Sequence, residues 1–71
     1  MNRINVIIDY HPKYDMYSIK MIENSDVILC NEFNLIDITQ KMLKPEITFT
    51  QRAEENLGDD LKNQLKNLEE I

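Results

Sequence analysis

The only histidine of the chain, His11, lies between two aspartates, Asp9 and Asp15. An imidazole beside carboxylates can act as a general base, provided that a nucleophile lies within hydrogen-bond reach and a carboxylate orients the ring. The sequence places no serine or cysteine obviously beside this group. Catalysis by His11 is therefore the least supported interpretation of this stretch, and we expect that the protein is not an enzyme.

Tyrosines surround the same stretch. Tyr10 and Tyr17 lie on opposite sides of Pro12, which lacks a backbone donor and therefore interrupts strand pairing. One interpretation is a hairpin in which Tyr10 and Tyr17 pair across the strands and His11 is solvated. The other is a contact surface, because tyrosine gives a large contact area at a small entropic cost. In that case Tyr14 and Tyr17 are the expected partner-binding residues.

The remaining reactive groups exclude several classes of site. Cys30 is the single cysteine, so the chain cannot form an internal disulfide, and its place in a strand pattern predicts a buried, inert thiol. The carboxylates lack the spacing of an EF-hand or another Mg²⁺ site. Gly58 is the single glycine, which excludes a glycine-rich phosphate loop. The sequence thus predicts no metal and no cofactor.

The charge balance limits the class of partner. The chain has 71 residues, with 13 acidic and 8 basic side chains and a net charge of −5. Phosphate backbones repel such a chain, so we expect no direct binding to nucleic acid, whereas a basic protein is attracted. No apolar segment approaches the roughly 18 residues that a membrane span needs, and no secretion signal is recognisable. Together with the lone cysteine, these features predict a cytoplasmic protein without membrane contact.

Short apolar segments must position these groups. Residues 4–10 have a period of two, with Ile4, Val6, Ile8 and Tyr10 on one face and Asn5, Ile7 and Asp9 on the other, as in a half-buried strand. Residues 16–22 and 27–30 read as two more strands, and short polar turns connect all three, so we expect an antiparallel meander. A helix then opens at Asn34, a favoured N-cap residue, and Pro45 ends it.

The second half of the chain continues with alternating elements. Residues 46–50 form a brief fourth strand, Thr50 caps a helical stretch over 51–57, and Gly58 separates it from a last helix. The whole chain, residues 1–71, is thus expected to be one α+β domain. Its predicted architecture is an antiparallel three- to four-stranded sheet with one helix packed on it and a C-terminal helix, in the order β-β-β-α-β-α.

The C-terminal region, residues 51–71, has the pattern of an amphipathic acidic helix. Its leucines recur at spacings of four, four and three residues. This stripe can fold back on the sheet of the same chain, pair with a second copy in a homodimer, or insert into the groove of a partner. The leucines of the stripe are Leu57, Leu61, Leu65 and Leu68. The acids beside them, which we expect to bind a partner, are Glu54, Glu55, Asp59 and Asp60.

The order of elements over the first part of the chain also carries a family resemblance. A first strand ends in Asp9 and Tyr10, a second is led by Tyr17, a third ends at Cys30, and a helix follows. In these features residues 4–43 resemble the small HicB-like antitoxins. The resemblance implies a partial ribonuclease-H-like sheet with a helix, and an antitoxin-like role in which the domain masks a small basic ribonuclease.

Taken together, size, charge and residue types favour a small acidic, non-catalytic inhibitor or adaptor that binds a basic, nucleic-acid-handling protein. A phage counter-defence protein of the anti-CRISPR type, with carboxylates in the place of phosphates, is the concrete form of this hypothesis. Two alternatives stay open at this point. One is a HicB-like antitoxin that neutralises a small basic ribonuclease toxin, and the other is a structural homodimer without an inhibitory role.

Overall fold

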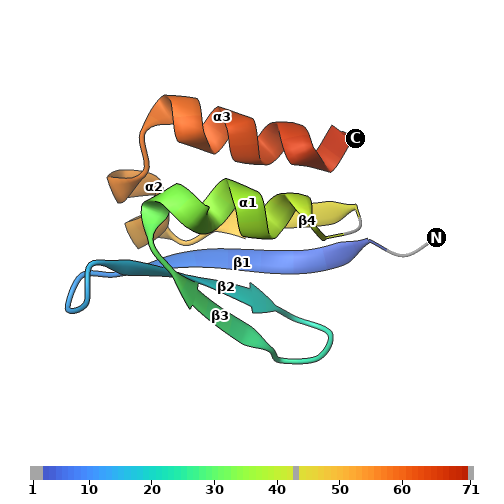
Figure 1. The fold of residues 1–71 in the computed structure, drawn as a ribbon, viewed down its shortest axis with the longest axis horizontal. Helices are drawn as coiled ribbons and strands as arrows, with labels where there is room; N and C mark the ends of the chain where they lie inside the picture. Colours follow the sequence, from blue (N-terminus) through green and yellow to red (C-terminus); the bar gives the residue numbers. More distant parts are fainter. Residues whose placement is uncertain (1–2, 43, 71) are drawn as a thin grey trace.

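The elements follow one another in the predicted order (Figure 1). The computed structural model describes residues 3–42 and 44–70. Its α+β class is confirmed, and the C-terminal region is divided into separate helices. The elements are β1 (Ile4–His11), β2 (Met16–Met21), β3 (Val27–Cys30), η1 (Glu32–Asn34), α1 (Leu35–Gln40), β4 (Pro45–Phe49), α2 (Gln51–Asn56), α3 (Asp59–Asn67) and η2 (Leu68–Glu70).

The sheet is mixed rather than wholly antiparallel. β1, β2 and β3 form the predicted antiparallel meander, and the strand order is β3-β2-β1-β4. β4 pairs with β1 in the parallel direction, with Ile4 opposite Pro45 and Ile8 opposite Phe49. A parallel neighbour requires a crossover connection, which the segment containing α1 provides by returning the chain to the end where β1 begins. The expectation of an antiparallel fourth strand is corrected here, because the residue pattern indicates a strand but does not encode its direction.

One face of the sheet carries the core, and the helices pack on that face (Figure 1). The predicted alternation is confirmed, since Ile8 and Ile19 are fully buried and Val6 and Ile47 nearly so. Cys30 is also buried, as predicted, and burial raises the pKa of its thiol. Within the described residues no helix covers the opposite side of the sheet, which we call the open face.

The helix starts explain how the chain leaves the sheet. Asn34 occupies the N-cap position of α1, but its side chain makes no capping bond. Instead, the Asn31 side chain accepts a hydrogen bond from the Asn34 N–H at 3.1 Å and starts the short turn η1 before α1. The predicted cap at Thr50 is confirmed, because its hydroxyl accepts a bond from the Ala53 N–H at 3.2 Å.

The leucine stripe of the C-terminal region lies in the core of its own chain. Leu65 is fully buried and Leu57 is 4% exposed, while Leu61 and Leu68 are partly buried against the core. Gly58, as predicted, separates α2 from α3, and α3 runs back across the molecule beside α1 (Figure 1). The stripe therefore folds back on its own domain, which is the first of the three arrangements considered above.

Candidate functional site

His11 has a closer neighbour than the sequence suggested. Its Nε2 lies 2.8 Å from the Ser18 Oγ, on the open face. The two residues are diagonal neighbours in the β1–β2 ladder, in which Asp9 is opposite Ser18 and His11 is opposite Met16. The residue pattern predicted that the first strand ends at Tyr10, but β1 continues through His11. The hairpin register then brings His11 beside Ser18. A hydroxyl next to an imidazole is the first requirement of an activated nucleophile.

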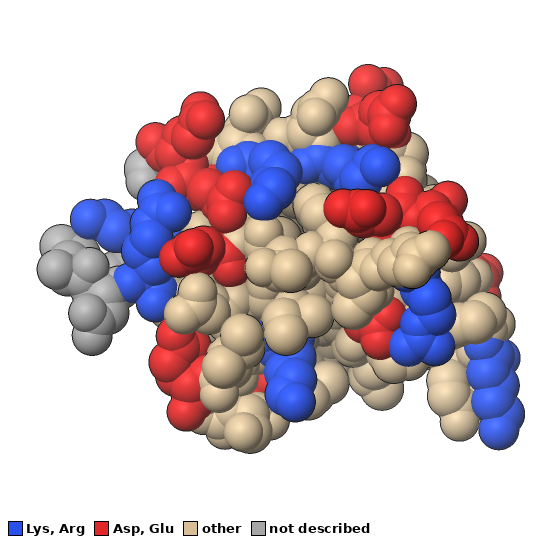
Figure 2. Space-filling view, turned by 180° about the vertical axis from the view of Figure 1, so that it is seen from behind, with Lys and Arg blue, Asp and Glu red and all other residues tan. Residues whose placement is uncertain are grey.

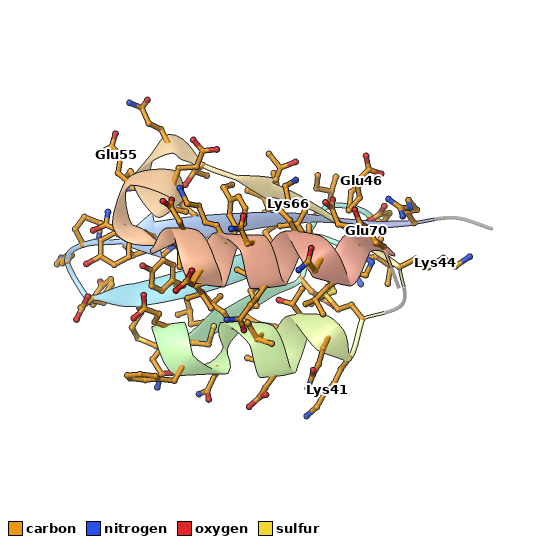
Figure 3. All side chains as sticks on the ribbon, turned by 90° about the horizontal axis from the view of Figure 1, so that it is seen from above. Lys41, Lys44, Glu46, Glu55, Lys66 and Glu70 are labelled. Atoms are coloured by element: carbon orange, nitrogen blue, oxygen red, sulfur yellow. The ribbon has the colours of Figure 1, made fainter. Side chains whose placement is uncertain are left out.

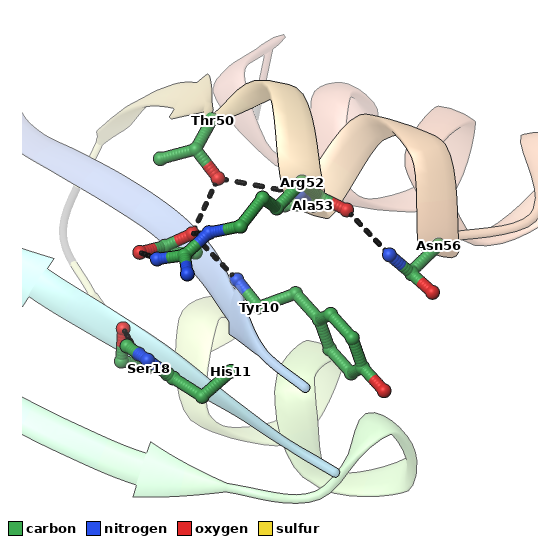
Figure 4. A network of polar contacts seen from close by, with 8 residues as sticks. Tyr10, His11, Ser18, Thr50, Arg52, Ala53 and Asn56 are labelled. Carbon is green, nitrogen blue, oxygen red and sulfur yellow. Dashed lines mark hydrogen bonds and ion pairs between the residues drawn. The ribbon is translucent and has the colours of Figure 1, made fainter. Parts of the chain in front are cut away.

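The second requirement is a group that orients the imidazole, but Asp9 is bonded to other residues. Figure 4 labels its partners Tyr10, Thr50 and Arg52. Its Oδ1 accepts bonds from the Thr50 hydroxyl at 2.6 Å and the Tyr10 N–H at 2.8 Å, and its Oδ2 lies 2.6 Å from Arg52 Nη2. Burial raises the pKa of Asp9, but these bonds and the Arg52 charge together lower it below its usual value. Asp9 thus ties the end of β1 to the start of α2 and is not free to activate His11.

Tyr10 and Tyr17 pair across the hairpin, as one of the two interpretations predicted. They are opposite each other in the ladder, with ring centroids 4.9 Å apart. Tyr17 is only 4% exposed, and burial raises its pKa to about 12. The expectation that Tyr17 binds a partner is therefore corrected, because its side chain points to the helix-covered face and belongs to the core. Tyr10 donates its hydroxyl to Asp15 Oδ1 at 2.8 Å.

The acidic residues predicted to bind a partner gather at one end of the molecule. Strands β1, β3 and β4 run in the same direction, so the hairpin loop, η1 and α2, which follow them, meet at this end (Figure 1). The α2–α3 junction lies there too. Exposed carboxylates from all of these segments define what we call the acidic end. They are Asp15, Glu32, Glu54, Glu55, Asp59 and Asp60.

Few cations balance these charges. Arg52 pairs with Asp9, and Lys62 lies 3.5 Å from Asp59. Lys13, in the hairpin loop, lies 5.6 Å from the centroid of the Tyr14 ring. Figure 2 shows carboxylates over this end, on the right of that view, with Lys and Arg side chains among them. The acidic end therefore has an excess of negative charge that a basic surface can match.

Two large aromatic side chains project from the same end. Phe33 is 86% exposed and Tyr14 is 67% exposed. A shallow groove of about 480 Å³ is lined by Phe33, Ile36 and Leu61, and the carboxylates Glu32 and Asp60 also line it. The residue pattern did not predict Phe33 as a contact residue. Its position in a polar turn that begins at Asn31, outside any amphipathic pattern, was the available signal.

Other kinds of site find no support in the described parts of the chain. Across residues 3–42 and 44–70, His, Cys, Asp and Glu side chains form no group of three that could hold a metal ion. Among the helices of the same ranges, none combines the length and the apolar character that a membrane crossing requires.

Comparisons with known proteins leave the site to be interpreted from its own geometry. The sequence matches no protein-family model, and neither a curated protein nor a solved structure matches the chain at a significant level.

Proposed function

We propose that this protein is a small acidic, non-catalytic inhibitor or adaptor whose acidic end binds a basic, nucleic-acid-handling protein. The observation that carries the proposal is the coincidence of exposed carboxylates with two exposed aromatic rings, Phe33 and Tyr14, at one end of the molecule. A phage counter-defence protein of the anti-CRISPR type is the concrete form of the proposal. It would act in the cytoplasm, which is that of the host if a phage encodes it.

The two kinds of residue contribute differently to such binding. Exposed carboxylates steer a positively charged partner during diffusion and raise the association rate, and salt weakens this effect. Phe33 provides an apolar anchor beside the groove formed by Ile36 and Leu61. Aromatic anchors of this kind dominate the affinity of many interfaces, and a charged rim contributes mainly orientation.

The test compares two variants with the same change in net charge. In the first, the predicted binding acids are neutralised: Glu54→Gln, Glu55→Gln, Asp59→Asn and Asp60→Asn. In the matched control, exposed acids outside the acidic end are neutralised: Glu23→Gln, Asp26→Asn, Glu46→Gln and Glu70→Gln. The partner is first captured from host lysate with the wild-type chain and identified by mass spectrometry. Association rates of the purified pair are then measured at low salt.

We expect the first variant to associate at least about tenfold more slowly than the wild type, because steering is lost. The control should stay within about twofold, since its charges lie outside the contact. Equal binding of the first variant and the wild type at low salt would overturn the proposal. A Phe33→Ala variant tests the anchor separately and should raise the dissociation rate.

The HicB-like antitoxin is the second candidate function. The observation that favours it is the three-stranded meander followed by α1, which is the element order on which the resemblance of residues 4–43 rests. This proposal predicts a gene for a small basic ribonuclease next to the gene for this chain. Co-expression of the two should restore growth of cells that the ribonuclease arrests, and failure to do so would remove this candidate.

The proposed absence of catalysis can be tested directly. The described contacts pair His11 with Ser18 but leave Asp9 bonded to Arg52, Thr50 and the main chain. We therefore expect no turnover of ester or phosphodiester substrates by the purified chain. Turnover that disappears in a His11→Ala variant would contradict this part of the proposal.

A further inference from the structure

The edge of the sheet at β3 has backbone groups without partners. β3 is the outermost strand, and the Met21 N–H donates to the Asp26 carbonyl at 2.9 Å where the β2–β3 ladder begins. In an antiparallel ladder, residues that bond the neighbouring strand alternate with residues that face away from it. The N–H and C=O groups of Val27 and Leu29 therefore point outward, and no partner for them is found within the described residues.

The same two residues expose apolar side chains on the open face. Val27 is 54% exposed and Leu29 is 61% exposed. With Ile7 and Lys20 they border a shallow groove of about 320 Å³. Isolated exposed apolar side chains are ordinary, but here they stand on a strand whose backbone is also unpaired. Such an edge is a template for the addition of another strand.

The opposite edge of the sheet is closed. On β4, the Ile47 N–H donates to Glu69 Oε2 at 2.8 Å, and the Ile47 carbonyl accepts a bond from Lys66 Nζ at 2.8 Å. Lys66 and Glu69 also pair with each other at 3.3 Å. Figure 3 shows Lys66 on the side of α3 that faces β4. These bonds occupy the outer groups of the central residue of β4 and oppose strand addition there, which leaves β3 as the open edge.

We propose that β3 pairs with β3 of a second copy of this chain in an antiparallel, two-fold symmetric dimer. The outward backbone groups determine the register. Val27 of one copy exchanges both bonds with Leu29 of the other, and Ile28 lies opposite Ile28. This register uses all outward groups of both copies and keeps every bonded residue inside the four-residue strand. A register centred on Val27 would instead require Ser25, whose φ of 62° is incompatible with a strand.

The side chains are compatible with this arrangement on both faces. On the open face, each Val27 lies beside Leu29 of the second copy, so the exposed apolar groups cover one another. On the helix-covered face, the two Ile28 side chains meet and extend the core. Asp26 lies opposite Cys30 of the second copy, so no carboxylate directly faces another in the paired strands. Because the edge is short, the dimer should be weak and depend on concentration.

Engineered disulfides test the register. The Ile28 pair is a non-hydrogen-bonded pair, with Cα atoms about 4.5 Å apart, which lies within the range of about 4.4–6.8 Å that a disulfide allows. An Ile28→Cys variant should therefore form a cross-linked dimer under mild oxidation. Val27→Cys is the matched control, since the two Val27 positions are offset by two residues and lie too far apart. The wild-type chain controls for Cys30, which lies opposite Asp26.

Sedimentation equilibrium tests the dimer without oxidation. The wild-type mass should rise from one chain toward two with concentration, whereas a Leu29→Lys variant should stay monomeric, because it places two lysines in the apolar contact. Tyr14→Lys, at an equally exposed site away from β3, should behave as the wild type. A wild-type chain that stays monomeric at millimolar concentration would overturn the proposal. Equal cross-linking of Ile28→Cys and Val27→Cys would overturn it too, as would a dimer that survives Leu29→Lys.

Discussion

The two edge strands of this sheet, β3 and β4, differ in whether their outward backbone groups are hydrogen-bonded. β4 is followed by helices, and the side chains of Lys66 and Glu69 bond the outer N–H and C=O of Ile47. β3 has Val27 and Leu29 exposed on the open face and outward backbone groups without a partner among the described residues. The closed edge depends on Lys66 of α3 and Glu69 of η2, so the C-terminal segment that fills the core also opposes strand addition at β4.

The largest expected effect comes from truncating Leu65, which packs α3 on the sheet beside the closed β4 edge. Leu65 is fully buried and holds α3 against the core. A Leu65→Ala variant should lose about 3–5 kcal/mol of unfolding free energy, because the change leaves a cavity in a small core. Urea denaturation at pH 7 measures the loss. Leu29→Ala, at an exposed leucine on β3, is the matched control and should change stability by less than about 0.5 kcal/mol. Equal losses of unfolding free energy in the two variants would contradict the proposed difference between the β3 and β4 edges.

The next effect concerns Asp9, which ties the end of β1 to the helix after β4. An Asp9→Asn variant should lose about 1.5–3 kcal/mol at pH 7, because charged hydrogen bonds to Arg52 and Thr50 are weakened. The pKa of Asp9 is lowered in the folded state. Its contribution is therefore complete above its unfolded pKa of about 3.9 and is lost as the pH falls through the folded value.

The wild type and Asp9→Asn should accordingly converge in stability at low pH. Urea denaturation at a series of pH values from neutral to strongly acidic measures this convergence. A stability difference that is constant over the whole range would show that the Asp9 carboxylate contributes nothing as a charged group.

A smaller effect is expected from opening the closed edge itself. In a Glu69→Ala variant the Ile47 N–H loses its acceptor, so stability should fall by about 1 kcal/mol. Amide exchange at Ile47, measured by NMR, should accelerate. Glu70→Ala is the control, because Glu70 is the exposed neighbour and the described contacts give it no bond to β4. Unchanged exchange at Ile47 in the first variant would mean that Glu69 does not close the edge.

The smallest effect requires no substitution. In dilute solution, the amides of Val27 and Leu29 should exchange much faster than those of Ile28 and Ile47, which are bonded to β2 and Glu69. Raising the protein concentration should protect Val27 and Leu29 if the β3 edges pair. Protection of both amides already in dilute monomer would show that some part of the same chain covers this edge.

Much of the fold could be predicted from local patterns. Alternation in residues 4–10 identified β1 and its buried face, and Thr50 and Gly58 marked the helix boundaries as observed. These signals are short-range, because a strand face and a cap are determined by neighbouring residues. The direction of β4 was not predictable in this way, since parallel and antiparallel strands of five residues can have the same pattern.

The candidate site was predicted less completely. The four acids predicted to bind a partner, Glu54, Glu55, Asp59 and Asp60, are exposed as expected. Tyr17, in contrast, is buried, and the exposed Phe33 was not predicted as a contact residue. Tyrosine is amphipathic, so composition alone could not decide between contact surface and core. Phe33 lies in the short turn capped by Asn31, and its exposure follows from the path of the chain between β3 and α1.

The sequence by itself determined the α+β fold class, the inward face of the strands and the negative net charge. Those properties follow from side-chain types and from periodicity along the chain. Only the tertiary structure decided which strand edge is closed, that Ser18 lies beside His11, and that carboxylates from four separate segments share one end. Each of these depends on register and on packing between residues far apart in the chain, and local sequence does not encode that relation.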